Sequence, residues 1–201
     1  MMNYGDERPE LLKYDPFKAI IAPRPIGWIG TLNADGVPNL GPYSFFNGIG
    51  SRPNQLFFSS EGEKHSYLNA KARGEFTVSL ATEALKDEMN ISSAHVEDGV
   101  SEFELAGLEL GKPVEIATPF VAASPAAFEC VVIDTMQMKD RFGNLTDRYL
   151  TFGEVVRTHI ADDYISNGRF DSARARPIAR LGYRDYATVE SVWQLKRPQE
   201  K

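Results

Sequence analysis

The sequence predicts a mainly β fold, an antiparallel barrel that is closed or split and carries a few helices, in one domain over residues 1–201. Strand patterns outnumber helical patterns and follow one another as hairpins, whereas a doubly wound sheet would alternate its strands with long helices. The length suits a single domain, and the chain contains no internal repeat and no low-complexity linker.

The first strands are predicted to form a hairpin. Residues 24–32 place apolar side chains on one face at strand spacing, and 33–36 contains the Asp-Gly pair that is typical of a tight turn. The second arm, 37–47, contains Pro38 and Pro42, which cannot donate ladder hydrogen bonds. This arm is therefore expected at a sheet edge, at a bulge or beside a ligand.

The middle of the chain alternates strand and helix. Residues 55–60 read as a strand, 67–73 repeats apolar positions at helical spacing, and 75–80 is a short strand. Thr82 stands where an N-cap would begin a helix that runs through residue 90.

The second half is dominated by two long β-rich runs, 126–138 and 149–160. They are joined through 140–144, where a glycine is available for positive φ. A second, longer hairpin is expected here.

Composition and charge exclude several classes of protein. Lys and Arg number 22 against 28 Asp and Glu, so the net charge is −6, and the basic field that holds proteins on phosphate backbones is missing. No apolar run approaches the roughly 18 residues of a membrane span, and residues 1–10, which include Asp6, Glu7 and Arg8, do not have the pattern of a signal peptide. We expect no nucleic-acid partner, no membrane and a cytoplasmic location, which suits a chain whose only cysteine is Cys130.

The run Lys64-His65-Ser66 is a candidate anion site. It comes just before the predicted helix over 67–73, where unpaired amides and the helix dipole favour a negative charge. Lys64 adds a cation, the Ser66 hydroxyl can cap the helix or bond the anion, and Ser59 and Ser60 end the preceding strand with further donors. A phosphate would fit here, although the same residues could be a plain N-cap and a solvated lysine.

Other chemistries lack their motifs. The sequence has no Gly-x-x-x-x-Gly-Lys-Ser/Thr loop, no Gly-x-Ser-x-Gly elbow and no His-x-x-x-His pair, so phosphate-loop, hydrolase and metal sites are not expected. His159, on the predicted strand 149–160, is more often a structural histidine than a proton donor. We predict no catalytic acid, base or nucleophile.

Several stretches together resemble the flavin reductase-like family of FMN-binding split barrels. They are Arg24-Pro25-Ile26-Gly27-Trp28-Ile29-Gly30-Thr31, Asp35-Gly36-Val37-Pro38-Asn39-Leu40-Gly41-Pro42-Tyr43-Ser44-Phe45-Phe46, Lys64-His65-Ser66, Gly74 to Leu80, Met89-Asn90, Phe103 to Leu108, Gly153 to Val156, Arg180 to Tyr183 and Asp185 to Ala187. The sequence departs from the commonest family pattern at Gly41, at His65-Ser66 and at Ser79, where Ala, Asp-Thr and Asn are usual.

The resemblance implies a six-stranded antiparallel barrel with a few helices, a homodimer, and FMN in a groove at the dimer interface. The implied cofactor-binding residues are Pro42, Tyr43, Ser44 and Phe45 beside the isoalloxazine ring, Ser59 and Ser60 toward the ribityl chain, and Lys64, His65 and Ser66 at the phosphate. A homodimer is also expected because one barrel of this size can hardly bury all of its apolar residues, such as Trp28, Phe45 and Phe46, at once.

The implied activity is that of an FMN-containing oxidoreductase, which takes a hydride from NADH or NADPH and passes electrons onward. The acceptor is left open between free flavin, a partner oxygenase, a ferric chelate and an organic small-molecule substrate. One alternative is an FMN-binding electron carrier or ligand-binding barrel without nicotinamide turnover. A weaker alternative is an oxidase of the pyridoxamine phosphate type.

Overall fold

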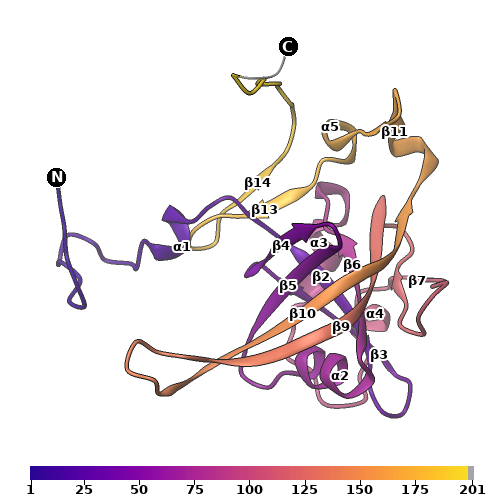
Figure 1. The fold of residues 1–201 in the computed structure, drawn as a ribbon, viewed down its shortest axis with the longest axis horizontal. Helices are drawn as coiled ribbons and strands as arrows, with labels where there is room; N and C mark the ends of the chain where they lie inside the picture. Colours follow the sequence, from indigo (N-terminus) through magenta and orange to yellow (C-terminus); the bar gives the residue numbers. More distant parts are fainter. Residues whose placement is uncertain (199–201) are drawn as a thin grey trace.

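The computed structural model describes residues 1–198, and in these residues one antiparallel sheet of seven strands dominates the fold (Figure 1). The strand order is β3-β2-β6-β9-β10-β5-β4. The strands are β2 (Gly27–Leu32), β3 (Pro38–Tyr43), β4 (Phe46–Ser51), β5 (Asn54–Glu61), β6 (Glu75–Leu80), β9 (Ala126–Lys139) and β10 (Leu145–Ile160).

The remaining elements are short. The helices are α1 (Phe17–Ile20), α2 (His65–Arg73), α3 (Lys86–Ile91), α4 (Glu102–Leu105) and α5 (Ser172–Ala175), with 3₁₀ turns at Glu83–Leu85 and Asp162–Tyr164. The small strands are β1 (Arg24–Pro25), β7 (Leu110–Gly111), β8 (Phe120–Val121), β11 (Ile165–Ser166), β12 (Arg169–Phe170), β13 (Ile178–Arg180) and β14 (Tyr186–Thr188). Within the described residues no helix has the length and apolar composition needed to cross a membrane.

The sheet curls so that β3 approaches β5, although these two strands are not hydrogen-bonded neighbours. The barrel is therefore split along the seam between β3 and β5. This confirms the predicted class, a mainly β split barrel with few helices, and the sheet has seven strands where six were expected because β4 adds itself outside β5.

Both predicted hairpins are confirmed. β2 pairs with β3 around a turn in which Gly36 has φ +81°, and β9 pairs with β10 around a turn in which Gly143 has φ +89°. β3 is an edge strand, as its prolines indicated. The predicted second arm over 37–47 is wrong at its far end, because β3 stops at Tyr43 and the chain turns into β4.

The core is divided between the two faces of the sheet, and β2 serves both. Ile29 packs inside the barrel with Phe58 and Phe76, where Ala70 of α2 joins them. Trp28, on the other face, packs against Phe103 of α4 in the second cluster.

Because outer elements cover β2, this strand is buried on both faces instead of one. Trp28 is fully buried within a single chain. It therefore gives no support to the expected homodimer.

Candidate functional site

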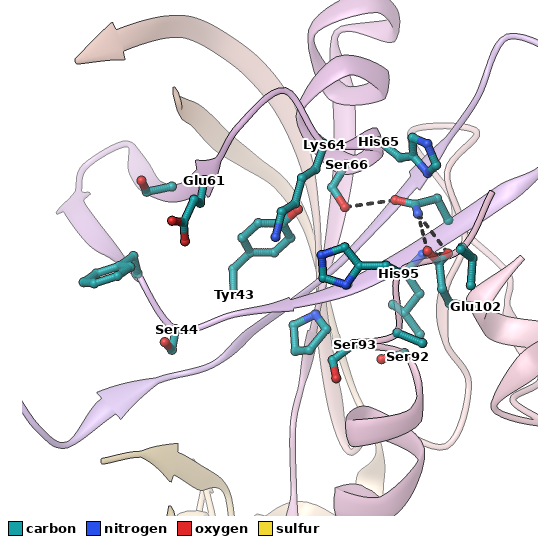
Figure 2. Close-up of a pocket in the computed structure, with 18 of the residues that line it drawn as sticks. Tyr43, Ser44, Glu61, Lys64, His65, Ser66, Ser92, Ser93, His95 and Glu102 are labelled. Atoms are coloured by element: carbon teal, nitrogen blue, oxygen red, sulfur yellow. Dashed lines mark hydrogen bonds between the residues drawn. The ribbon is translucent and has the colours of Figure 1, made fainter. Parts of the chain in front are cut away.

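A pocket of about 450 Å³ opens at the seam between β3 and β5. Its walls come from the end of β3 and the link to β4, from β5, from the start of α2, and from the segment that follows α3 (Figure 2). Lys18 of α1, Glu102 of α4 and Arg148 of β10 complete the lining. Elements far apart in the sequence thus converge on one polar cavity.

The structure brings together all but one of the predicted cofactor-binding residues. Those that line the pocket are Pro42, Tyr43, Ser44, Phe45, Ser59, Lys64, His65 and Ser66. Ser60 is fully buried, does not line the pocket, and donates its hydroxyl to the carbonyl of Gly62 at 2.8 Å. Whether these residues bind FMN stays a prediction.

The start of α2 has the geometry of an anion site. The helix begins at His65, two residues earlier than predicted, and its first bond runs from the Leu68 amide to the Lys64 carbonyl. The amides of His65, Ser66 and Tyr67 lie ahead of that bond and have no acceptor within the helix. The Lys64 side chain extends into the pocket beside them (Figure 2). The Lys64 cation and the N-terminus of α2 therefore both favour a negatively charged group at this end of the pocket.

The Ser66 hydroxyl does not cap the helix, contrary to one expectation. It donates instead to Oδ1 of Asn39 at 2.9 Å. The Asn39 amide nitrogen lies 2.8 Å from each carboxylate oxygen of Glu102, and the amide of Leu40 donates to the same carboxylate at 2.9 Å. A buried polar network therefore lies beneath this end of the pocket.

Tyr43 forms part of the pocket wall near this network. Burial raises the pKa of the Tyr43 phenol, and hydrogen bonding with Ser66 and Ser60 opposes that rise only in part. The phenol therefore stays neutral at physiological pH. Next to it, a Cβ on Gly41 would lie 3.3 Å from both the Tyr43 ring and the Ser66 oxygen, which leaves little spare room at this point.

Cations lie around Phe45 and along the rim. The Phe45 ring has Lys18 Nζ 6.0 Å and the Arg24 guanidinium 5.7 Å from its centroid. Arg148 pairs with Glu61 at 3.0 Å, and this hydrogen bond is the main reason why the pKa of Glu61 lies below its usual value. The rim thus carries both charge signs in close contact.

Sequence reasoning missed the other lining residues, which are Lys18, Asn39, Leu40, Gly41, Glu61, Glu63, Glu102, Arg148 and the segment 92–96. Asn39 and Glu102 are 63 positions apart, and Arg148 comes from a hairpin that was assigned no role. The local periodicity of a sequence does not indicate which distant residues come into contact in the folded chain.

His159 does not line the pocket. Its Nε2 lies 2.6 Å from Glu129, a fully buried carboxylate that also accepts the amides of Val114, Glu115 and Ile116. It is a satisfied structural histidine, as its strand position indicated. Among residues 1–198, no three His, Cys, Asp or Glu side chains gather closely enough to hold a metal ion.

Comparison with known proteins adds to this geometry. Residues 21–177, which contain the whole seven-stranded sheet, match the family model described as a flavin reductase like domain. The chain belongs to the flavin reductase-like family. Membership places it among flavin-related oxidoreductases.

Individual flavin reductase-like relatives agree with this. An uncharacterized protein of Deinococcus radiodurans is 32% identical, with 94% of this chain and 86% of that protein covered. Among solved structures, nitrilotriacetate monooxygenase component B from Bacillus cereus is 28% identical at TM-score 0.88, covering 97% of this chain and 98% of that one. The 2-nitrobenzoate 2-nitroreductase NbaA of Pseudomonas fluorescens is 25% identical at TM-score 0.84, covering 99% and 97%.

Proposed function

We propose that the protein binds FMN in the pocket at the barrel seam and passes electrons from NADH or NADPH to an acceptor. The observation that carries this is the start of α2, where free amides and Lys64 face one end of the cavity. Such an end suits one phosphate group, and FMN has one. The cavity of about 450 Å³ lies within the roughly 300–1,000 Å³ usual for cofactor sites.

The chain's own residues would bind and orient the cofactor. The backbone from Pro42 to Phe45 would run beside the ring system, and Ser59 would face the ribityl chain with Ser60 behind it. Lys64 and His65 would hold the phosphate together with the amides of the first turn of α2.

When bound, the flavin supplies the redox chemistry. No side chain of the pocket is required as a catalytic acid, base or nucleophile, because hydride acceptance belongs to the cofactor. The nicotinamide would stack transiently in the open part of the pocket, since the chain has no dinucleotide loop of its own.

Two measurements test the proposal. The purified protein should bind FMN more tightly than riboflavin, by titration of flavin fluorescence. Anaerobic stopped-flow mixing of the FMN-loaded protein with NADH or NADPH should bleach the flavin absorbance. Equal affinity for riboflavin would refute the phosphate assignment.

The same mixing experiment separates the alternatives. If dithionite reduces the flavin and neither nicotinamide does, the protein is an electron carrier or a ligand-binding barrel. Turnover of pyridoxamine phosphate would instead support an oxidase.

We also propose that two chains assemble as a homodimer. The β9–β10 hairpin projects from the barrel (Figure 1). Its exposed apolar side chains include Ile133, Met136, Met138, Phe142 and Leu145. An apolar surface of this kind is typical of an interface between proteins. Light scattering should give twice the mass of one chain, and a monomeric mass with FMN fully bound would contradict the proposal.

Several electron acceptors are proposed, from flavin chemistry and from one structural relative. Component B of nitrilotriacetate monooxygenase is by its name one part of an oxygenase system, and a partner oxygenase is therefore one acceptor to test here. Free flavin, a ferric chelate and a small organic substrate are the others. Nicotinamide consumption measured with each in turn would identify the acceptor. A cytoplasmic location suits such chemistry.

A further inference from the structure

The hydrogen bonds beneath the pocket all run in one direction. Asn69 Nδ2 donates to Thr31 Oγ1 at 3.3 Å, and Thr31 Oγ1 donates to Asn39 Oδ1 at 3.0 Å. Ser66 Oγ donates to the same Asn39 oxygen at 2.9 Å, and Asn39 Nδ2 donates to Glu102. Every donor in this series of hydrogen bonds points toward the Glu102 carboxylate, and Figure 2 shows the part of the series between Ser66 and Glu102 as dashed lines.

Glu102 sets this direction because a carboxylate only accepts hydrogen bonds. It is 5% exposed, and both of its oxygens receive N–H groups. The Asn39 side chain must therefore turn its NH₂ toward Glu102 and its carbonyl oxygen toward Ser66 and Thr31. Those two hydroxyls then have to donate, since the oxygen that faces them has no hydrogen.

This arrangement determines the direction in which the Ser66 hydroxyl donates its hydrogen. A serine hydroxyl carries one hydrogen, and here that hydrogen is directed to Asn39. Ser66 is 3% exposed, so its hydroxyl hydrogen meets a protein acceptor, Asn39, and not solvent. Toward the pocket Ser66 can offer only lone pairs, and the Tyr43 phenol, with which Ser66 is hydrogen-bonded, is one donor that meets them.

We propose that Glu102 is a positioning residue which, through Asn39, holds Ser66 as a hydrogen-bond acceptor, so that the Ser66 hydroxyl does not donate to the phosphate of bound FMN. The ligand atom that meets Ser66 is a donor, such as a ribityl hydroxyl. The phosphate is held by Lys64 and by the amides at the start of α2. This rests on the proposed function, since it requires a flavin in the pocket.

The first test compares FMN with riboflavin, which lacks the phosphate. Lys64→Ala should reduce the FMN-to-riboflavin affinity ratio, whereas Ser66→Ala should leave this ratio within about twofold of the wild type. If Ser66 donated to the phosphate, Ser66→Ala would lower the ratio about tenfold, and that result would overturn the proposal. Failure of both flavins to bind the wild-type protein would instead overturn the proposed function.

The second test removes the requirement that the Ser66 hydroxyl donate to Asn39. In Glu102→Gln the amide can present N–H to Asn39, which lets Asn39 turn and frees the Ser66 hydroxyl to donate into the pocket. The FMN-to-riboflavin ratio should then rise several-fold, up to about tenfold. Glu104→Gln, at an exposed position of the same helix, is the matched control and should change nothing.

A double variant separates this effect from the loss of a nearby negative charge. In Glu102→Gln with Ser66→Ala the rise should vanish, because no hydroxyl remains to donate. A rise that persists in the double variant, or a ratio that Glu102→Gln leaves unchanged, would show that Glu102 does not act through Ser66.

Asn39→Ala provides the same test if the Glu102 variant does not fold, since it keeps the charge and removes the acceptor of the Ser66 hydrogen. It should also raise the ratio, and an unchanged ratio in this variant would overturn the proposal. Thermal unfolding of each variant verifies that the compared proteins are folded.

Discussion

Two buried glutamates in this molecule, Glu129 and Glu102, have opposite surroundings. Glu129 accepts three main-chain amides from the loop 114–116 and contacts His159, and none of these groups lines the pocket. Glu102 accepts one main-chain amide, and its other partner is the side chain of Asn39, which leads to the pocket through Ser66.

A structural carboxylate differs from one that serves a site in the kind of group that binds it. Main-chain amides are fixed by the fold, so the bonds to Glu129 close a loop onto the barrel and transmit nothing to a ligand. Side-chain partners can turn, so the bonds to Glu102 set the orientation of groups that a ligand meets. Burial alone does not distinguish the two.

The largest expected effect tests the structural side of this comparison. Glu129→Ala leaves three amides and the His159 ring without their acceptor, so the free energy of unfolding should fall by about 3–5 kcal/mol. Urea unfolding followed by circular dichroism measures this. FMN affinity of the folded fraction should change less than about twofold. A tenfold loss of FMN affinity in the folded protein would contradict the claim that Glu129 does not act on the pocket.

The next effect is expected at the pocket. In the proposed site Lys64 gives the FMN phosphate a charge-assisted hydrogen bond of roughly 1.5–3 kcal/mol, so in Lys64→Ala FMN should bind about ten- to a hundredfold more weakly. Stability should be nearly unchanged, since the Lys64 side chain is exposed. Lys71→Ala, in the last turn of the same helix, is the control. Unchanged FMN affinity would mean that Lys64 is only solvated.

His159→Ala tests a partner of Glu129 that does not line the pocket. Removing this partner of Glu129 should cost about 1–2 kcal/mol of stability. The anaerobic rate of flavin reduction by a nicotinamide should remain within about twofold of the wild type, because the flavin accepts the hydride itself. If reduction is abolished while FMN stays bound, a side chain is required after all.

The smallest expected effect is a pH dependence of stability. Burial acts to raise the pKa of Glu129, but hydrogen bonds from His159 and the three amides outweigh it and hold the pKa below the usual 4.5. A lowered folded-state pKa stabilises the fold above the unfolded value, and this contribution is lost as the pH falls through the folded-state value. The wild type should therefore lose stability as the pH falls below about 4.5, and the part of this loss that comes from Glu129 should be missing in Glu129→Gln. An identical pH profile would show that this carboxylate does not titrate during unfolding.

The sequence predicted the parts of the fold that have local causes. Both hairpins follow from turns whose glycines, Gly36 and Gly143, adopt positive φ, and the strand over 75–80 was predicted with its observed bounds. The break between β3 and β4 was missed, because nothing at Ser44 or Phe45 marks a turn. The burial of β2 on both faces was also missed, since covering elements come from distant segments.

The candidate site divides in the same way. Lys64, His65 and Ser66 could be found because a helix start and a cation are adjacent in sequence. Glu102 could not, since its partner Asn39 is 63 positions away and only the folded chain brings them together. The hydrogen bond from the Ser66 hydroxyl to Asn39 could not be predicted for the same reason, because its acceptor lies on another strand.

The edge strand β3 has one more consequence, for association between chains. The Leu40 amide donates to Glu102 and not to β2, so Leu40 directs its main-chain N–H away from β2. Alternate residues of a strand direct their main chain to the same side, so Pro38 and Pro42 also face away from β2. Two of the three outward positions therefore have no N–H, and the third is occupied. An open edge normally offers a template on which a foreign strand can add. Here the pocket wall lacks the donors for that, and the barrel can stay open for a ligand without inviting aggregation.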